Sequence, residues 1–167
     1  MLLRPARPGD ELAVAGVHVR AWQSGYRGIL SDAFLDGLSI EDRARRYTFG
    51  APEPERPRTI VAEEGGAILG FAATAPAGDA PGAGELAALY VEPTAWGRGV
   101  GRELIAAARA RLVEQGFGEA VLWLMVGNER AARFYAADGW RPEADSRCAG
   151  QAWGAAFEKI RYRRALR

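Results

Sequence analysis

The chain has 167 residues, of which 49% are hydrophobic and 26% are charged, the composition of an ordinary globular domain. Its 22 basic and 21 acidic residues give a formal net charge of +1, which argues against a nucleic-acid-binding surface or a polybasic membrane anchor. The length predicts a single domain covering residues 1–167.

The first part of the chain is predicted to form a short strand followed by helices. Residues 2–7 are strand-like, and Asp10 is a candidate N-cap for the first helix. Beyond Asp10, apolar residues recur at steps of three and four, which predicts an amphipathic helix. Its apolar stripe is Leu12, Ala15, Val19, Trp22 and Tyr26. A second short helix is predicted to begin at Ser31, and a third helical piece to cover residues 41–49.

Three strand-like runs follow. Residues 58–64 and 67–75 flank Gly65-Gly66, which is a hairpin signal. Residues 85–93 form a third run that ends at a proline. The three runs predict neighbouring strands of one sheet.

The last part of the chain alternates helices and strands. A helix is predicted over residues 98–115 and a buried strand over residues 119–126, because that second run is continuously apolar. Asn128 is predicted to cap a helix that ends at residue 137. Residues 139–148 and 151–164 are expected to close the fold as an antiparallel pair. This order predicts a mixed α/β fold with helices on both faces of a mixed sheet.

Cysteine, histidine and hydropathy bear on the compartment. The only cysteine, Cys148, allows no internal disulfide, and one histidine, His18, is too few for a metal site. The N-terminus MLLRPARPGDE lacks an apolar segment of secretory length, and the longest uncharged stretch, residues 65–78, is too short to span a bilayer. We therefore expect a cytoplasmic protein with no metal, no nucleic acid and no membrane partner.

Three alternating glycines, Gly97, Gly99 and Gly101, stand where strand 85–93 leads into helix 98–115. Glycines let backbone N–H groups approach an anion closely, and a helix N-terminus adds about half a positive charge. Arg98 and Arg102 add full positive charges. A pyrophosphate would fit this loop. The alternative is a tight strand-to-helix turn that binds nothing.

Two nucleotide motifs that use such loops do not match. The dinucleotide fingerprint needs a third glycine where Arg102 or Leu104 stands. The P-loop needs a Gly-Lys-Ser/Thr ending, and no lysine is near.

The segments LYVEPTAWGRGVGRELI (residues 89–105) and VLWLMVGNERAARFYAADGWR (residues 121–141) resemble the GNAT superfamily of acyl-CoA-dependent N-acetyltransferases. The family loop is usually Gln/Arg-x-x-Gly-x-Gly/Ala. Gly99 and Gly101 match it, whereas Trp96 stands where Gln or Arg is usual. The resemblance implies the GNAT fold, a central mixed and mostly antiparallel sheet with helices on both faces and a splay between the fourth and fifth strands.

The resemblance also implies that acetyl-CoA is the co-substrate. Backbone N–H groups of residues 98–102 would hold its pyrophosphate, and the backbone of residues 89–91 would pair with its pantetheine arm like an added strand. Asn128 matches an asparagine that contacts the cofactor arm in relatives, although a plain helix N-cap is the alternative. The expected cofactor-binding residues are Leu89, Tyr90, Val91, Trp96, Gly97, Arg98, Gly99, Val100, Gly101, Arg102, Asn128 and Tyr135.

Direct attack of an amine on a thioester needs an oxyanion donor and a proton donor, and the resemblance suggests one residue for each. The backbone N–H of Val91 would stabilise the oxyanion. Tyr135 matches the tyrosine that often acts as general acid, and the alternative is a core aromatic beside Phe134. An unperturbed tyrosine, with a pKa near 10, would give its proton to a thiolate near 8.5 at a cost of about 2 kcal/mol, which orientation or a lowered pKa would offset.

The reaction also needs an uncharged amine. Neutralising a lysine-like amine at pH 7 costs roughly 4 to 5 kcal/mol, so a base is useful. Glu85 opens the strand 85–93, and a period of two places it on the same face as Leu89 and Val91. Acids near this position act as bases in several family members. The alternative for Glu85 is a solvated carboxylate at a strand end.

The acceptor side is less defined by the sequence. By resemblance, Trp22 and Tyr26 would wall the acceptor pocket together with Glu85, although the same stripe is typical of a core face. His18 is placed at a different helical angle from that stripe and is expected to be structural or exposed. Cys148 has no candidate base and is expected to be an ordinary strand residue.

We therefore expect an N-acetyltransferase that moves an acetyl group from acetyl-CoA to the primary amine of a small molecule. A protein, peptide N-terminal or lysine acetyltransferase remains an alternative, as does a non-catalytic acyl-CoA-binding regulator. A nicotinamide dinucleotide enzyme is the weakest alternative because of the missing glycines. Family analogy suggests a homodimer.

Overall fold

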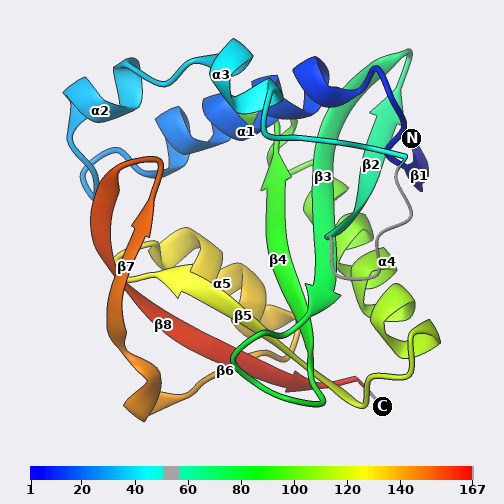
Figure 1. Ribbon diagram of the computed structural model, residues 1–167, viewed down its shortest axis with the longest axis vertical. Coiled ribbons are helices and arrows are strands. Elements are labelled where there is room, and N and C mark those ends of the chain that lie inside the picture. Colours follow the sequence, from blue (N-terminus) through cyan, green and yellow to red (C-terminus); the bar gives the residue numbers. More distant parts are fainter. Residues whose placement is uncertain (51–56, 167) are drawn as a thin grey trace.

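The computed structural model describes residues 1–50 and 57–166, which fold around one eight-stranded sheet (Figure 1). The strand order is β1-β2-β3-β4-β5-β8-β6, and β7 pairs with β8. The strands are β1 (Leu2–Pro5), β2 (Arg58–Glu64), β3 (Ala67–Pro76), β4 (Gly84–Val91), β5 (Glu119–Met125), β6 (Arg141–Pro142), β7 (Cys148–Ala152) and β8 (Ala155–Ala165). The predicted hairpin and the buried strand are confirmed. The closing segment is antiparallel as expected, but the predicted strand 139–148 is reduced to the short β6, and a turn at residues 153–154 divides the predicted strand 151–164 between β7 and β8.

The pairing of β4 with β5 divides the sheet. Every other pairing in the sheet is antiparallel, whereas β4 and β5 are parallel and meet only at Gly84↔Ala120 and Glu85↔Val121. Beyond these pairs the two strands diverge, as Figure 1 shows. The splay implied by the resemblance is therefore confirmed, and it leaves one edge of β4 free of a partner strand.

Helices cover both faces of the sheet, as expected. They are α1 (Glu11–Gly25), α2 (Asp32–Asp36), α3 (Ile40–Ala44), α4 (Val100–Glu114) and α5 (Glu129–Ala137), with short 3-10 turns at Pro93–Ala95 and Ala144–Ser146. In β3, Phe71 packs in a cluster with Val14 of α1, whereas its neighbour Ala72 packs in a cluster with Leu104 of α4. Because successive strand residues point to opposite faces, α1 and α4 lie on opposite sides of the sheet.

The first helix differs in detail from its predicted stripe. Leu12 is 57% exposed, whereas Val14, Val17 and His18 are buried. α1 packs against both the sheet and α3, so its buried face is wider than one stripe. Asp10 precedes the helix without capping it through its side chain, because its carboxylate pairs with the Arg4 guanidinium at 2.7 Å.

Two helix boundaries were also predicted wrongly. The third helical piece ends at Ala44 instead of residue 49. α4 begins at Val100 instead of residue 98, because Gly99 has a φ of 87°, in the left-handed region that a right-handed helix cannot include. Within the described ranges, every helix is too short or too polar to cross a membrane.

Candidate active site

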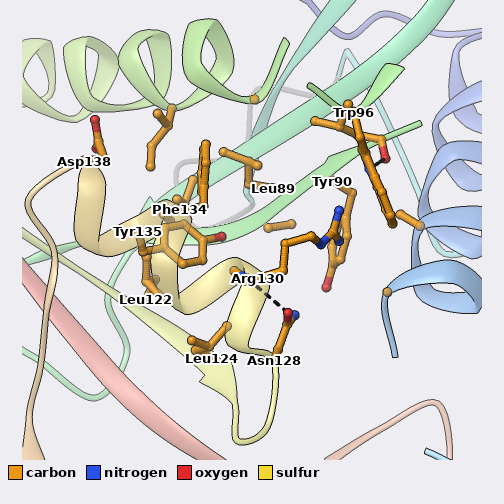
Figure 2. A pocket seen from close by; sticks show the side chains of 18 of the residues that line it. Leu89, Tyr90, Trp96, Leu122, Leu124, Asn128, Arg130, Phe134, Tyr135 and Asp138 are labelled. Carbon is orange, nitrogen blue, oxygen red and sulfur yellow. Dashed lines mark hydrogen bonds between the residues drawn. The ribbon is translucent and has the colours of Figure 1, made fainter. Parts of the chain in front are cut away.

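A cavity of about 680 Å³ opens where β4 and β5 diverge (Figure 2). It is bordered by the end of α1, by β4, by the loop that enters α4, and by β5 and α5. The predicted site residues that line it are Tyr26, Leu89, Tyr90, Val91, Trp96, Gly97, Gly99, Val100, Gly101, Arg102, Asn128 and Tyr135. Three predicted residues, Trp22, Glu85 and Arg98, lie outside its lining.

The free edge of β4 presents backbone groups to this cavity. The amide of Glu92 donates to the Leu69 carbonyl at 2.8 Å, on the side of β3. Because hydrogen-bonded and non-bonded pairs alternate along an antiparallel ladder, the N–H and C=O of Leu89 and Val91 point away from β3 into the gap. The backbone of Tyr90 faces β3, so the contribution of Tyr90 to the cavity comes from its side chain.

Trp96 occupies the position where the resemblance leads one to expect Gln or Arg. Its indole Nε1 donates to the Val91 carbonyl at 2.8 Å, so this side chain fixes the turn between β4 and the glycine loop. The guanidinium carbon of Arg130 lies 3.4 Å from the centroid of the Trp96 ring. The aromatic ring therefore brings a cation from α5 to a place where the family usually has a polar or charged side chain.

The loop before α4 has open backbone, as its glycines predicted. Gly97 and Gly99 have φ values of 79° and 87°, and a Cβ added to either would have no neighbour within 4 Å. This free space, at the N-terminus of a 15-residue helix, fits a diphosphate held by backbone N–H groups.

Three other predicted residues of the loop, Gly101, Arg98 and Arg102, differ in where they lie relative to the cavity. Gly101 lies inside the first turn of α4, where a Cβ would touch the Phe134 ring at 3.4 Å, so it serves helix packing. Arg98 Nη2 pairs with Glu64 Oε2 at 2.5 Å, which directs this side chain away from the cavity. Arg102 lines the cavity and supplies the positive charge expected there.

Asn128 and Tyr135 come from α5. Asn128 is the N-cap of that helix, and its side-chain oxygen accepts from the Ala131 amide at 3.1 Å, as the dashed line in Figure 2 shows. Tyr135 is 8% exposed, and its hydroxyl lies within the cavity lining. Burial, and secondarily Tyr90, raise the pKa of Tyr135 well above its ordinary value. A lowered pKa was one way to ease proton donation, and the structure has the opposite, which favours a hydrogen-bond donor that stays protonated.

Glu85 does not share a face with Leu89 and Val91, contrary to the period-two prediction. Ala73 pairs with Ala88 and Thr74 with Leu86, so Ala87 is an extra residue that reverses the alternation. Leu86 therefore packs in the same cluster as Val91, on the α4 side, and its neighbour Glu85 points to the α1 side.

The surroundings of Glu85 raise the pKa of its carboxyl. Burial is the main cause and the carboxylate of Asp79 adds to it, whereas Lys159 acts in the opposite direction. The Asp79 carboxylate itself accepts from Trp123 Nε1 at 3.1 Å, and the Lys159 ammonium lies 4.1 Å from the centroid of the Trp123 ring. These residues place Glu85 at the closed end of the splay.

The aromatic residues of α1 have different roles. Tyr26 lines the cavity. Trp22 is buried outside the lining, where its ring stacks on Trp153 with 4.3 Å between the centroids. His18 is also buried and shares a face with Trp22, with ring centroids 5.9 Å apart, so the predicted difference in helical angle was wrong. Its Nδ1 lies 2.6 Å from the Tyr47 hydroxyl, and burial, followed by the charge of Arg43, lowers its pKa well below the usual value. His18 is structural, as expected.

Sequence reasoning missed several cavity residues. Arg130, Phe134 and Leu124 line the cavity without having been predicted, and Tyr90, expected to contribute its backbone, lines it through its side chain (Figure 2). One feature of the sequence could have identified Arg130: it is in the first turn of α5, where its positive charge is unfavourable next to the positive end of the helix dipole. An arginine in such an unfavourable position suggests a functional role. Among the described residues no group of three or more His, Cys, Asp or Glu side chains could hold a metal ion.

Comparison with known proteins gives a family match over most of the chain. The model of the acetyltransferase (GNAT) family matches residues 21–140. The uncharacterized N-acetyltransferase YuaI of Bacillus subtilis is 26% identical over 128 residues, which cover 75% of this chain and 72% of YuaI.

Solved structures share the fold. The PaiA N-acetyltransferase of Thermoplasma acidophilum, in complex with coenzyme A, is 17% identical with a TM-score of 0.74, and the similarity covers 98% of both chains. YncA of Salmonella typhimurium, a putative acetyltransferase with acetyl-CoA, is 20% identical with a TM-score of 0.72, over 100% of this chain and 94% of that one.

Proposed function

Because the chain belongs to the acetyltransferase (GNAT) family, we propose that it transfers the acetyl group of acetyl-CoA to the primary amine of a small molecule. The observation that carries the proposal is the cavity between β4 and β5, which combines an unpaired strand edge with an open glycine loop at a helix N-terminus. The T. acidophilum and S. typhimurium structures contain coenzyme A and acetyl-CoA, which supports the choice of acyl donor.

The cavity offers a separate place for each part of acetyl-CoA. Backbone N–H groups around Gly97 and Gly99, with the charge of Arg102, would hold the diphosphate. The inward N–H and C=O groups of Leu89 would pair with the amides of the pantetheine arm, as an added strand would. When bound, acetyl-CoA supplies an acetyl group activated as a thioester.

Two groups would act on the reacting atoms. The Val91 N–H points into the gap and would donate to the carbonyl oxygen of the acetyl group as negative charge develops there. The Tyr135 hydroxyl would donate to the departing sulfur. Its raised pKa keeps the hydroxyl protonated near neutral pH. The Trp96 indole, bound to the Val91 carbonyl, holds this peptide in place.

Glu85 is the proposed base or base relay. It lies on the α1 side of β4. Burial raises its pKa toward neutral pH, which makes its carboxylate a stronger base than that of an exposed glutamate. Glu85 lies outside the cavity lining, so its route to the amine is through water.

The size and closure of the acceptor side favour a small molecule. Trp153, at the tip of the β7–β8 hairpin, packs against Trp22 at 4.3 Å and His18 at 4.6 Å. This contact joins the hairpin to α1, and we expect it to obstruct an extended peptide that would lie between them. A protein or peptide acceptor is therefore the less favoured substrate.

Calorimetry with coenzyme A and an acetylation assay with mass detection test the proposal. The amine panel would contain free amino acids, polyamines, aminoglycosides and short peptides. We expect coenzyme A to bind, NAD not to bind, and a small amine to be acetylated. Tyr135→Phe should lower kcat by 10-fold or more and leave coenzyme A affinity nearly unchanged. Binding without turnover of any amine would indicate an acyl-CoA-binding regulator, and turnover of peptides alone would overturn the small-molecule proposal.

A further inference from the structure

Arg130 is an exposed arginine that lines the cavity and has no carboxylate partner among the described residues. It is in the first turn of α5, and its side chain extends across the gap toward Tyr90 and Trp96 (Figure 2). Its contacts are the Trp96 ring, 3.4 Å away, and the end of α1, where a Cβ on Gly25 would lie 3.1 Å from Nη2. A guanidinium held by packing alone is available for an anion.

Neutral hydrogen-bond donors share the cavity with this guanidinium. The hydroxyls of Tyr26 and Tyr90 lie beside each other, and burial is the main cause that raises the pKa of Tyr26. Tyr90 and Tyr135 add to this effect on the pKa, and Arg130 acts in the opposite direction. Tyr26, Tyr90, Tyr135 and Arg130 all line the same cavity. The indole Nε1 of Trp22, behind Tyr90, is buried with no hydrogen-bond partner of normal geometry in the described part of the chain. The group is rich in donors and lacks a carboxylate acceptor.

Arg130 touches Trp96 of the glycine loop, but its other neighbours lie on the acceptor side of β4. The side chain of Tyr90 packs on the α1 side of β4, in the cluster of Val14 and Val17, and Gly25 is the last residue of α1. The glycine loop instead opens at the N-terminus of α4, and α4 lies on the other face of the sheet. The guanidinium thus lies on the side from which an amine would approach the Val91 N–H and the Tyr135 hydroxyl.

We propose that Arg130, with the hydroxyls of Tyr26 and Tyr90, binds a carboxylate of the acceptor, so that the acceptor is an amino acid or a similar amine with a neighbouring carboxylate. This inference rests on the acetyltransferase function proposed above and narrows its substrate class. A planar guanidinium with flanking hydroxyls suits a carboxylate, since charge-assisted hydrogen bonds are the strong ones. The carboxylate would hold the acceptor so that its amine faces the acetyl group.

The test compares amino acids with their carboxamides, which keep the amine and the side chain and lose the negative charge, with kcat/KM expressed per concentration of uncharged amine because the amide also lowers the amine pKa. We expect the wild-type chain to use at least one amino acid with a kcat/KM about 10- to 100-fold above that of its amide, the range of one charge-assisted hydrogen bond. Arg130→Met should bring this ratio close to one by raising the KM of the acid. Arg130→Lys should restore part of it. Arg133→Met is the matched control, because Arg133 is an exposed arginine on the same helix outside the cavity.

Coenzyme A affinity, measured on the same variants, separates the outcomes. If Arg130→Met leaves the Kd for coenzyme A within about twofold and removes the preference for acids, the inference stands. If the variant weakens coenzyme A by 10-fold or more, Arg130 serves the cofactor and the inference is overturned. Equal use of acids and amides by the wild-type chain overturns it as well, although the acetyltransferase proposal would survive. Failure of coenzyme A to bind the wild-type chain would instead reject the proposed function.

Discussion

One extra residue in β4 decides where Glu85 points. Ala87 has no partner in β3, and without it Glu85 would face α4 together with Leu89 and Val91. With it, the carboxylate lies on the α1 side, next to Asp79 and facing the charge of Lys159. A base is useful only on the side from which the amine arrives, so the bulge is part of the proposed site.

The pH dependence of catalysis should report on this carboxylate. A base must be ionised to act, so kcat/KM should fall as the pH is lowered through the pKa of Glu85. Because burial raises that pKa, this fall should occur at a higher pH than for an ordinary glutamate. Glu85→Gln should lower kcat/KM by about 100-fold and remove that fall. The exposed Glu114→Gln is the control and should change neither. An unaltered pH profile in Glu85→Gln would show that the carboxyl is not the base.

For individual residues, the sequence predicted the location of those that belong to a local motif. Tyr135, Asn128 and the loop glycines were placed correctly in the cavity because their register along the chain is fixed. Arg130 was missed because its role depends on Trp96, 34 positions earlier, and on the end of α1. Residues that act through contacts between distant elements leave little trace in local spacing.

The loop that leads into α4 is the element on which the donor site depends. Gly99 has a left-handed conformation and α4 begins at the next residue, Val100, while a Cβ on Gly99 would project into open space. A side chain at this position would be strained and would enter that space.

Replacing Gly99 by alanine should therefore impair both stability and binding. We expect Gly99→Ala to lower the free energy of unfolding by about 1–2 kcal/mol, because alanine disfavours positive φ. Coenzyme A affinity should fall by 10-fold or more. Gly118→Ala is the matched control, because Gly118 has open space and no positive φ, and it should change neither property. Normal coenzyme A binding by Gly99→Ala would contradict the proposed diphosphate site.

Most elements were predictable, and their boundaries and faces were less so. Hydrophobic periodicity and turn residues placed the strands of the central hairpin and the helices α4 and α5, before and after β5. The prediction that Leu12 belongs to the buried stripe of α1 was wrong. The helix is covered by α3 as well as by the sheet, and the local sequence pattern does not show this second contact. The bulge at Ala87 was equally invisible, since only pairing with β3 reveals an extra residue.

The whole molecule is built as two half-sheets with a narrow connection. Two residue pairs, Gly84↔Ala120 and Glu85↔Val121, join β4 to β5, and the core formed with α4 and α5 holds the halves together beyond them. The expectations of one domain, a cytoplasmic location and a homodimer remain predictions.

A ligand that pairs with the free edge of β4 should stabilise the whole fold, because it would bridge the two half-sheets. At coenzyme A concentrations near 100 times its Kd we expect about 2.7 kcal/mol of added stability, a Tm increase of roughly 5–10 °C. Hydrogen exchange should show new protection at the amides of Leu89 and Val91, which point into the gap. NAD is the negative control. Protection confined to the outer surface of α4, with unchanged exchange in β4, would reject pairing of the cofactor with this strand.

The free edge of β4 also has a bearing on which acyl groups the enzyme accepts. In the proposed function, main-chain groups of β4 bind the pantetheine portion, and that portion is identical in every coenzyme A thioester. Selection among short and long acyl chains must then come from the side chains at the inner end of the slot, such as Leu122, Leu124 and Phe134. Changing the bulk of those three residues is the direct route to a different acyl donor, with the rest of the binding surface left as it is.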